Sequence, residues 1–180
     1  MIDAKRTDAR LNEASARRIA AGRIALIERR IAAARHGPLP GKPNARVARM
    51  TAWLKEGCGD WLLDVYQEGR KTFYLMALPG EPKGWIDLAV YRYNARSDAL
   101  EEIALLARVS AHAAARLLEH RHDVDLERIL HEELVDSDWT WFVDRARQTA
   151  MVLETPHGEF RFKRDSDDRL IAVTWVLRRP

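Results

Sequence analysis

Two blocks of strand-like sequence, separated by helical sequence, constrain the fold of this chain most strongly. Between residues 61 and 94, the segments WLLDVYQEG, RKTFYLMALP and GWIDLAVYRYN are rich in aromatic and apolar residues, and Gly69 favours a hairpin turn between the first two. Residues 149–177 contain three more extended runs, separated by the turn sequences TPHG and DSDD. The blocks predict an antiparallel meander in mid-chain and an antiparallel sheet at the C-terminal end.

Two central helices are predicted between these blocks. Ser110 is a good N-cap for SAHAAARLLEHR, because its hydroxyl can accept from free backbone N–H groups. Asp123 or Asp125 can cap the next helix, DVDLERILHEELV, whose leucines and isoleucine share one face. Residues 97–109, SDALEEIALLARV, fit either a helix start or a buried strand. With a shorter helical stretch around ARVARMTAWLKEG, this order predicts an α+β fold.

The N-terminal segment differs from the rest in charge. Residues 1–50 carry twelve Lys and Arg against four Asp and Glu, a net +8, whereas the remaining residues carry eighteen against twenty-three, a net −5. We expect a basic helical arm over residues 1–36, a linker at 37–44 around GPLPGKP, and one α+β domain over 45–180. The arm suits an anionic partner, or it packs its isoleucine stripe (Ile19, Ile24, Ile27, Ile31) on the body or on a second subunit.

Several functional classes lack their sequence signals. No apolar run reaches the roughly 20 residues of a membrane span, and no signal peptide is evident, so we expect no membrane association and a cytoplasmic protein, or an effector exported by a dedicated machine. Phosphate-loop, dinucleotide, nucleophile-elbow and zincin motifs are missing. The histidines at 120, 122 and 131 lack metal-ligand spacing, and the single cysteine, Cys58, has no local base, so no metal and no cofactor is predicted.

His112 and Arg116 carry the catalytic hypothesis. They are four residues apart in the helix that Ser110 caps, so both side chains lie on one face. His112 belongs to the first turn, where the helix dipole disfavours a charged imidazole. A neutral imidazole next to a permanent cation suits a general base beside a phosphate-binding group. The same spacing also occurs on ordinary solvated helix faces, so both interpretations stay open.

The region from 109 to 177 resembles the small metal-independent ribonuclease and toxin domains of the barnase/EndoU/colicin/RelE-like superfamily. The matching pieces are SAHAAAR at 110–116, DLERILHEEL at 125–134, TPHGEFRF at 155–162 and IAVTWV at 171–176. The meander at 60–93 is not part of that pattern. The resemblance implies that His112 is the acid or base, that Arg116 binds phosphate and that Thr174 is a polar residue on a late strand.

The resemblance also implies a reaction and its partners. RNA supplies its own nucleophile, the 2′-hydroxyl, so cleavage needs a base, cations for the phosphate and an acid for the leaving oxygen. Arg121, Arg161 and Lys163 are the expected substrate-binding cations, and His157 is a candidate for the second proton transfer. RNA is the expected substrate, with a neutralising antitoxin or immunity protein as a further partner.

Two other functional classes stay open. Residues 98–120 also resemble a helix-turn-helix, whose second helix enters the major groove of DNA. Arg108 departs from that pattern, because the turn position is left-handed and favours glycine. The third class is a protein-interaction domain without catalytic activity, such as an immunity or adaptor protein.

Overall fold

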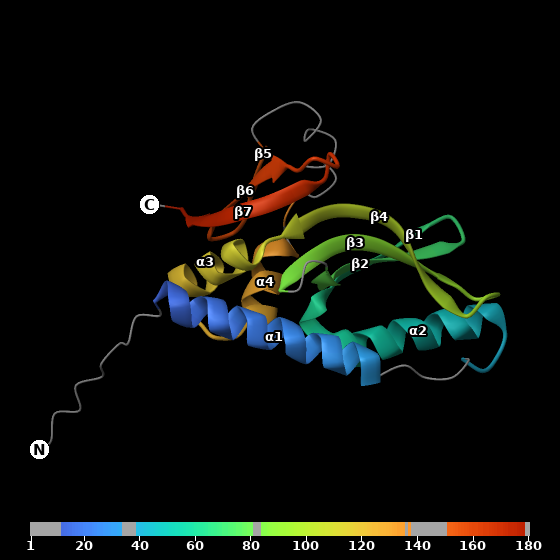
Figure 1. The fold of residues 1–180 in the computed structure, drawn as a ribbon. Helices are drawn as coiled ribbons and strands as arrows, with labels where there is room; N and C mark the ends of the chain where they lie inside the picture. The colour runs from blue at the N-terminus through green and yellow to red at the C-terminus, as the bar shows by residue number, and fades with distance from the viewer. Residues whose placement is uncertain (1–11, 34–38, 81–83, 136, 138–150, 179–180) are drawn as a thin grey trace, which may run out of the picture.

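A computed structural model describes residues 12–33, 39–80, 84–135, 137 and 151–178 of the chain (Figure 1). Its elements, in chain order, are α1 (Glu13–Ala33), α2 (Pro43–Cys58), the 3-10 turn η1 (Gly59–Trp61), β1 (Leu62–Glu68), β2 (Lys71–Gly80), β3 (Trp85–Asn94), β4 (Ala99–Val109), α3 (Ala111–Arg121), α4 (Leu126–Leu134), β5 (Met151–Glu154), β6 (Gly158–Arg164) and β7 (Leu170–Leu177). The predicted α+β class, with its N-terminal helix, is confirmed.

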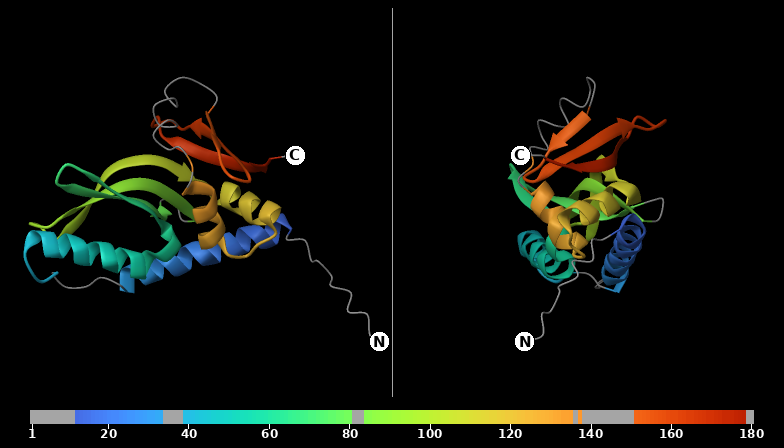
Figure 2. Two further views of the ribbon diagram at one scale, coloured as in Figure 1. Left: turned by 180° about the vertical axis from the view of Figure 1, so that it is seen from behind. Right: turned by 90° about the vertical axis from the view of Figure 1, so that its left-hand side faces the viewer.

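All the described strands join in one curved sheet. Their order is β1-β2-β3-β4-β7-β6-β5, and every neighbouring pair is antiparallel except β4 and β7. That parallel pair is short, with Arg108 opposite Ile171 and Val109 opposite Ala172. The predicted meander and C-terminal sheet therefore both form, and the short parallel pair connects them. Figure 2 shows the helices gathered on one side, below the curved sheet.

The predicted turn and cap residues have the expected local geometry. Gly69 has a φ of +60°, in the left-handed region that glycine tolerates, and it connects β1 to β2. The Ser110 hydroxyl accepts from the backbone N–H of Ala113 at 3.2 Å, at the start of α3. Asp125 caps α4 by accepting from the N–H of Arg128 at 3.3 Å. These local signals are confirmed.

The helix-turn-helix predicted for residues 98–120 does not form. Ala99–Val109 is a strand that pairs with β3 along its length, so its backbone hydrogen bonds go to a neighbouring strand and not to a helical turn. Arg108 lies within this strand, and its Nε atom lies 3.0 Å from Oδ1 of Asp87 on β3. The strand interpretation of this ambiguous segment was the right one, because cross-strand pairing outweighed its local helical signal.

The N-terminal helix α1 packs into the body of the protein. It lies beside α3 (Figures 1 and 2), and Ala16, Ala20, Ile24 and Ile27 are buried on its inner face. Ile19 is partly buried, while the side chain of Ile31 lies outside the described residues. Several arginines of α1, including Arg18 and Arg29, are exposed. Residues 39–42 of the expected linker form no helix or strand, and α2 begins at Pro43.

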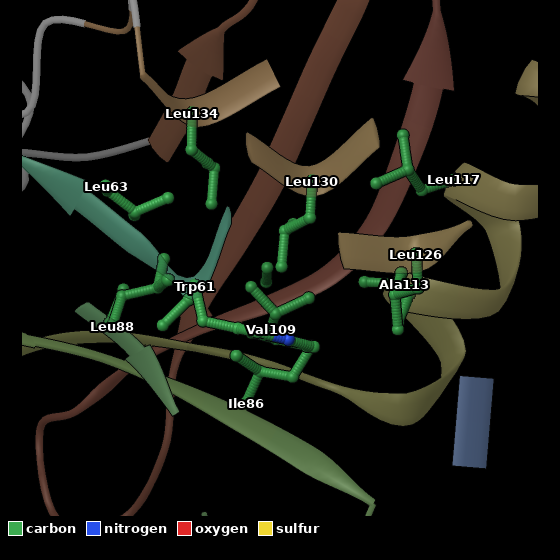
Figure 3. Packing of buried hydrophobic residues seen from close by; sticks show 14 of the residues in the cluster. Trp61, Leu63, Ile86, Leu88, Val109, Ala113, Leu117, Leu126, Leu130 and Leu134 are labelled. Atoms are coloured by element: carbon green, nitrogen blue, oxygen red, sulfur yellow. The ribbon is translucent and has the colours of Figure 1, made fainter. Parts of the chain in front are cut away.

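The core holds the two central helices against the sheet. Figure 3 shows apolar side chains of η1, β1, β3 and β4 meeting those of α3 and α4: Trp61, Leu63, Ile86, Leu88, Val109, Ala113, Leu117, Leu126, Leu130 and Leu134. Burying each of the larger side chains contributes roughly 1.5–3 kcal/mol. This packing fixes the positions of α3 and α4 relative to the sheet. Among the described residues, every helix is too short or too polar to span a bilayer.

Candidate functional site

His112 contacts the N-terminal helix. Its Nδ1 atom lies 3.3 Å from the guanidinium of Arg17 and 3.7 Å from the carboxylate of Glu13, and its side chain is 44% exposed. These contacts join the start of α3 to the start of α1. They explain the position of His112 without any substrate.

Arg116 is engaged on its own helix. Its guanidinium nitrogens lie 2.6 Å from the Glu119 carboxylate and 2.6 Å from Nε2 of His120. The His120 ring lies against the buried indole of Trp175, with 6.0 Å between centroids. Burial, followed by the nearby charge of Arg116, lowers the pKa of His120 below its usual value. Arg116 therefore interacts with His120, one helical turn further on.

Thr174 lies on the side of the sheet that faces away from α3. On β7 it sits opposite Arg161 of β6, and the next residue, Trp175, sits opposite Phe160. Phe160 and Trp175 are fully buried, and Trp175 contacts His120 of α3. Successive side chains on a strand point to opposite faces, so Thr174 and Arg161 point outward. The structure therefore places Thr174 on the opposite side of the sheet from α3, which carries His112 and Arg116, and does not bring these three residues together.

The expected cations on β6 form part of this outer face. Arg161 and Lys163 are exposed, while Phe160 and Phe162 between them are buried, as the alternation predicted. Arg161 donates to the carboxylate of Glu159 at 2.7 Å. Lys163 forms no ion pair with any residue in the described part of the chain. The outer face therefore brings together Arg161, Lys163 and Thr174, three of the predicted residues.

A second polar cluster gathers around Glu133, near the end of α4. The Glu133 side chain is 0% exposed, and one of its oxygens accepts from the Thr155 hydroxyl at 2.5 Å and from the backbone N–H of His157 at 3.3 Å. The other oxygen lies 2.9 Å from Nδ1 of His157 and forms an ion pair with Arg121. Arg121 also lies 2.8 Å from the same Nδ1 atom. This cluster brings two predicted residues, Arg121 and His157, to one place.

Local sequence explains how the cluster is built. Glu133 lies on the apolar face of α4, three residues after Leu130 and seven after Leu126, so the helix directs its carboxylate inward. Arg121 is the last residue of α3. Thr155 and His157 belong to the turn between β5 and β6, which a hydrogen bond from the N–H of Thr155 to the carbonyl of Gly158 closes.

A chain of ion pairs leads outward from Arg121. The Glu132 carboxylate lies 2.8 Å from Arg121 and also pairs with Arg128, which pairs in turn with Asp123. Partial burial would raise the pKa of Glu132, but hydrogen bonds from Arg128 and Arg121 outweigh it and lower that pKa. These ion pairs favour the ionised form of Glu132 and hold the guanidinium of Arg121 in place.

The cluster has the chemistry of a proton-transfer site. A buried carboxylate is costly unless cations and hydrogen bonds satisfy it, and Glu133 has both. The His157 side chain is 51% exposed, and its Nε2 atom makes no hydrogen bond to any described residue. One ring nitrogen is therefore held from behind, while the other is available to a substrate.

Sequence reasoning missed Glu133 and Thr155. The usable signal was a glutamate on the apolar face of an amphipathic helix, since such a residue needs buried partners. Cys58, expected to be unreactive, is buried at the end of α2, and this burial raises the pKa of its thiol to about 11. His131 contacts the backbone carbonyl of Asp60 at 3.0 Å. Within the described ranges, no three potential ligands gather as a metal site.

Comparison with protein-family models, curated proteins and solved structures found no significant match to this chain. The arrangement of its own side chains is therefore the basis for a functional hypothesis.

Proposed function

We propose that the protein is a metal-independent endoribonuclease in which His157 transfers the proton, Glu133 orients His157, and Arg121 provides positive charge. The observation that carries this proposal is the position of Nδ1 of the half-exposed His157, 2.9 Å from a fully buried carboxylate. This pairing of a buried acid with an exposed imidazole fixes the orientation of the ring, as in other proton-transfer sites.

The reaction follows from the groups available. RNA brings its own 2′-hydroxyl nucleophile, so the protein needs to supply proton transfer and positive charge but no nucleophilic side chain. Nε2 of His157 accepts the 2′-hydroxyl proton as the oxygen attacks phosphorus, and the imidazolium then returns a proton to the departing 5′-oxygen. The products are a 2′,3′-cyclic phosphate and a free 5′-hydroxyl. Glu133 holds the ring in position between the two proton transfers.

The substrate would extend along the neighbouring strand. Residues 158–164 form β6, which leads directly from the His157 turn to Arg161 and Lys163. Exposed cations on the strand that follows the proton-transfer residue suit the flanking phosphates of an RNA strand. The resemblance to ribonuclease toxins also implies a neutralising antitoxin or immunity protein. Such a partner would act by covering His157.

A pair of matched histidine variants tests the proposal. His157 and His112 have similar exposure, 51% and 44%, but only His157 contacts a buried carboxylate. We expect the purified protein to cleave single-stranded RNA in excess EDTA and to leave 2′,3′-cyclic ends. His157→Gln should reduce the rate by about 100-fold or more, while His112→Gln should retain it.

Three outcomes would contradict the proposal. Loss of cleavage in His112→Gln alone would return the activity to the helix face that the sequence first indicated. Equal cleavage by both variants would exclude either histidine as the proton-transfer group. No cleavage of structured or unstructured RNA by the unmodified protein would reject ribonuclease activity altogether.

A further inference from the structure

Nδ1 of His157 has two partners of opposite kind. It lies 2.8 Å from a guanidinium nitrogen of Arg121 and 2.9 Å from a carboxylate oxygen of Glu133. Arginine can only donate hydrogen bonds, and an ionised carboxylate can only accept them. A single ring nitrogen cannot satisfy both partners in the same protonation state. Each partner therefore favours a different tautomer of the neutral imidazole.

We infer that Arg121 and Glu133 hold the neutral His157 ring in two exchanging tautomers. In the first, Nδ1–H donates to Glu133, and the unprotonated Nε2 can accept a proton. In the second, Nδ1 accepts from Arg121, and Nε2–H is presented to the substrate as a donor. Exchange releases the proton on Nδ1 to solvent and takes up a proton from solvent at Nε2, or the reverse, so both tautomers carry the same charge.

Both partners stay in position whichever tautomer is present. The second terminal nitrogen of Arg121 is held by Glu132 at 2.8 Å, and the Arg121 side chain is only 16% exposed. The second oxygen of Glu133 is held by the Thr155 hydroxyl and by the backbone N–H of His157. Neither group has to rotate when the ring changes tautomer.

The catalytic meaning of this exchange rests on the proposed function. The tautomer favoured by Glu133 is the one that can take the 2′-hydroxyl proton. The tautomer favoured by Arg121 donates from Nε2 to a phosphate oxygen and so suits binding of the anion. Arg121 is thus a positioning residue for His157, in addition to any direct contribution of its charge.

The test is a nitrogen NMR measurement of the His157 ring in the full chain, at a pH where the imidazole is neutral. Protonated and unprotonated ring nitrogens resonate at well-separated positions, so an exchanging mixture gives intermediate values at both. We expect such intermediate values for the unmodified protein. Arg121→Met should move them to those of a ring protonated only at Nδ1. Arg116→Met, on the same helix but bonded to His120, should leave them unchanged.

The outcomes separate this inference from the proposed function. A ring protonated only at Nδ1 in the unmodified protein would overturn the inference, because Arg121 would then have no influence on the tautomer. A ring protonated only at Nε2 would overturn it too, because Glu133 would have none. The measurement needs no RNA, so absence of cleavage would reject the proposed function while leaving the tautomer result intact. If Arg121→Met does not fold, Glu133→Gln is measured instead, and it should move the values towards those of a ring protonated at Nε2.

Discussion

Gly158 lies directly against the indole ring of Trp175. A Cβ atom placed on Gly158 would lie 2.3 Å from Cζ2 of that ring and 2.4 Å from the backbone carbonyl oxygen of Val176. Trp175 is fully buried and is surrounded by the core, so it cannot move aside. The close approach of these two residues sets the position of the preceding residue, His157, directly before the start of β6.

Gly158→Ala should therefore destabilise the protein. The added methyl group overlaps a buried ring and a backbone carbonyl, and overpacking of this kind costs about 2 kcal/mol or more. Urea unfolding followed by tryptophan fluorescence measures the change. Gly22→Ala is the matched control, because Gly22 lies in α1 with nothing within 4 Å of the added atom. That variant should be about 1 kcal/mol more stable. Equal stability of the two variants would show that the Gly158 contact is not tight.

Glu133→Ala should destabilise the protein strongly, by about 3 kcal/mol or more. It removes the carboxylate that binds Arg121, Thr155 and His157 together, and it leaves a buried hydroxyl and a guanidinium partly unsatisfied. Its neighbour Glu132 is a fair control, because its carboxylate is 35% exposed and Arg128, one of its partners, lies at the surface. Glu132→Ala should cost under about 1 kcal/mol. Comparable losses in chemical unfolding would argue against a special role for the buried carboxylate.

Stability should fall as the solution is acidified through the titration of His120. Burial and then Arg116 lower the pKa of this histidine in the folded protein, so the unfolded chain, with a pKa of about 6.5, binds the proton more readily. The contribution is complete above about pH 6.5 and is lost as the pH falls through the lowered folded value. Protonation also replaces the bond from Arg116 to Nε2 of His120 by repulsion between two cations.

His120→Gln should remove that part of the pH dependence. Free energies of unfolding measured at about pH 7 and about pH 5 should then differ less in the variant than in the unmodified protein. His122, which is exposed, provides the control substitution to Gln. An identical pH dependence in all three proteins would show that His120 does not titrate differently on folding.

Ile24→Ala should lower stability by about 3 kcal/mol, because Ile24 is buried between α1 and the body of the protein. Arg18→Ala, on the exposed side of the same helix, should change stability little.

The salt dependence of RNA binding tests whether α1 also contacts RNA. If exposed arginines of α1 contact phosphate, Arg18→Ala should reduce the logarithmic salt slope by about one unit. An Ile24→Ala variant as stable as the unmodified protein would mean that α1 is a detachable arm.

The sequence by itself determined the features that depend on residues close together in the chain: helix caps, a hairpin turn and the alternation of a strand. Ser110 and Asp125 begin α3 and α4 because a short polar side chain can reach backbone N–H groups three residues ahead. Gly69 turns the first hairpin, and the alternation in β6 correctly placed Arg161 and Lys163 on the outer face. These signals act over a few residues and need no knowledge of the rest of the fold.

Only the tertiary structure decided how distant segments meet. Residues 99–109 had mixed local preferences, and pairing with β3 made them a strand, so the helix-turn-helix considered for residues 98–120 does not form. The side on which Thr174 lies follows from its pairing with Arg161 and from the position of α3 against Trp175. Glu133 and His157 are 24 residues apart in sequence, and they meet because the core fixes α4 next to the β5–β6 turn. Such contacts depend on packing of the whole chain, which is why short-range sequence patterns did not identify Glu133.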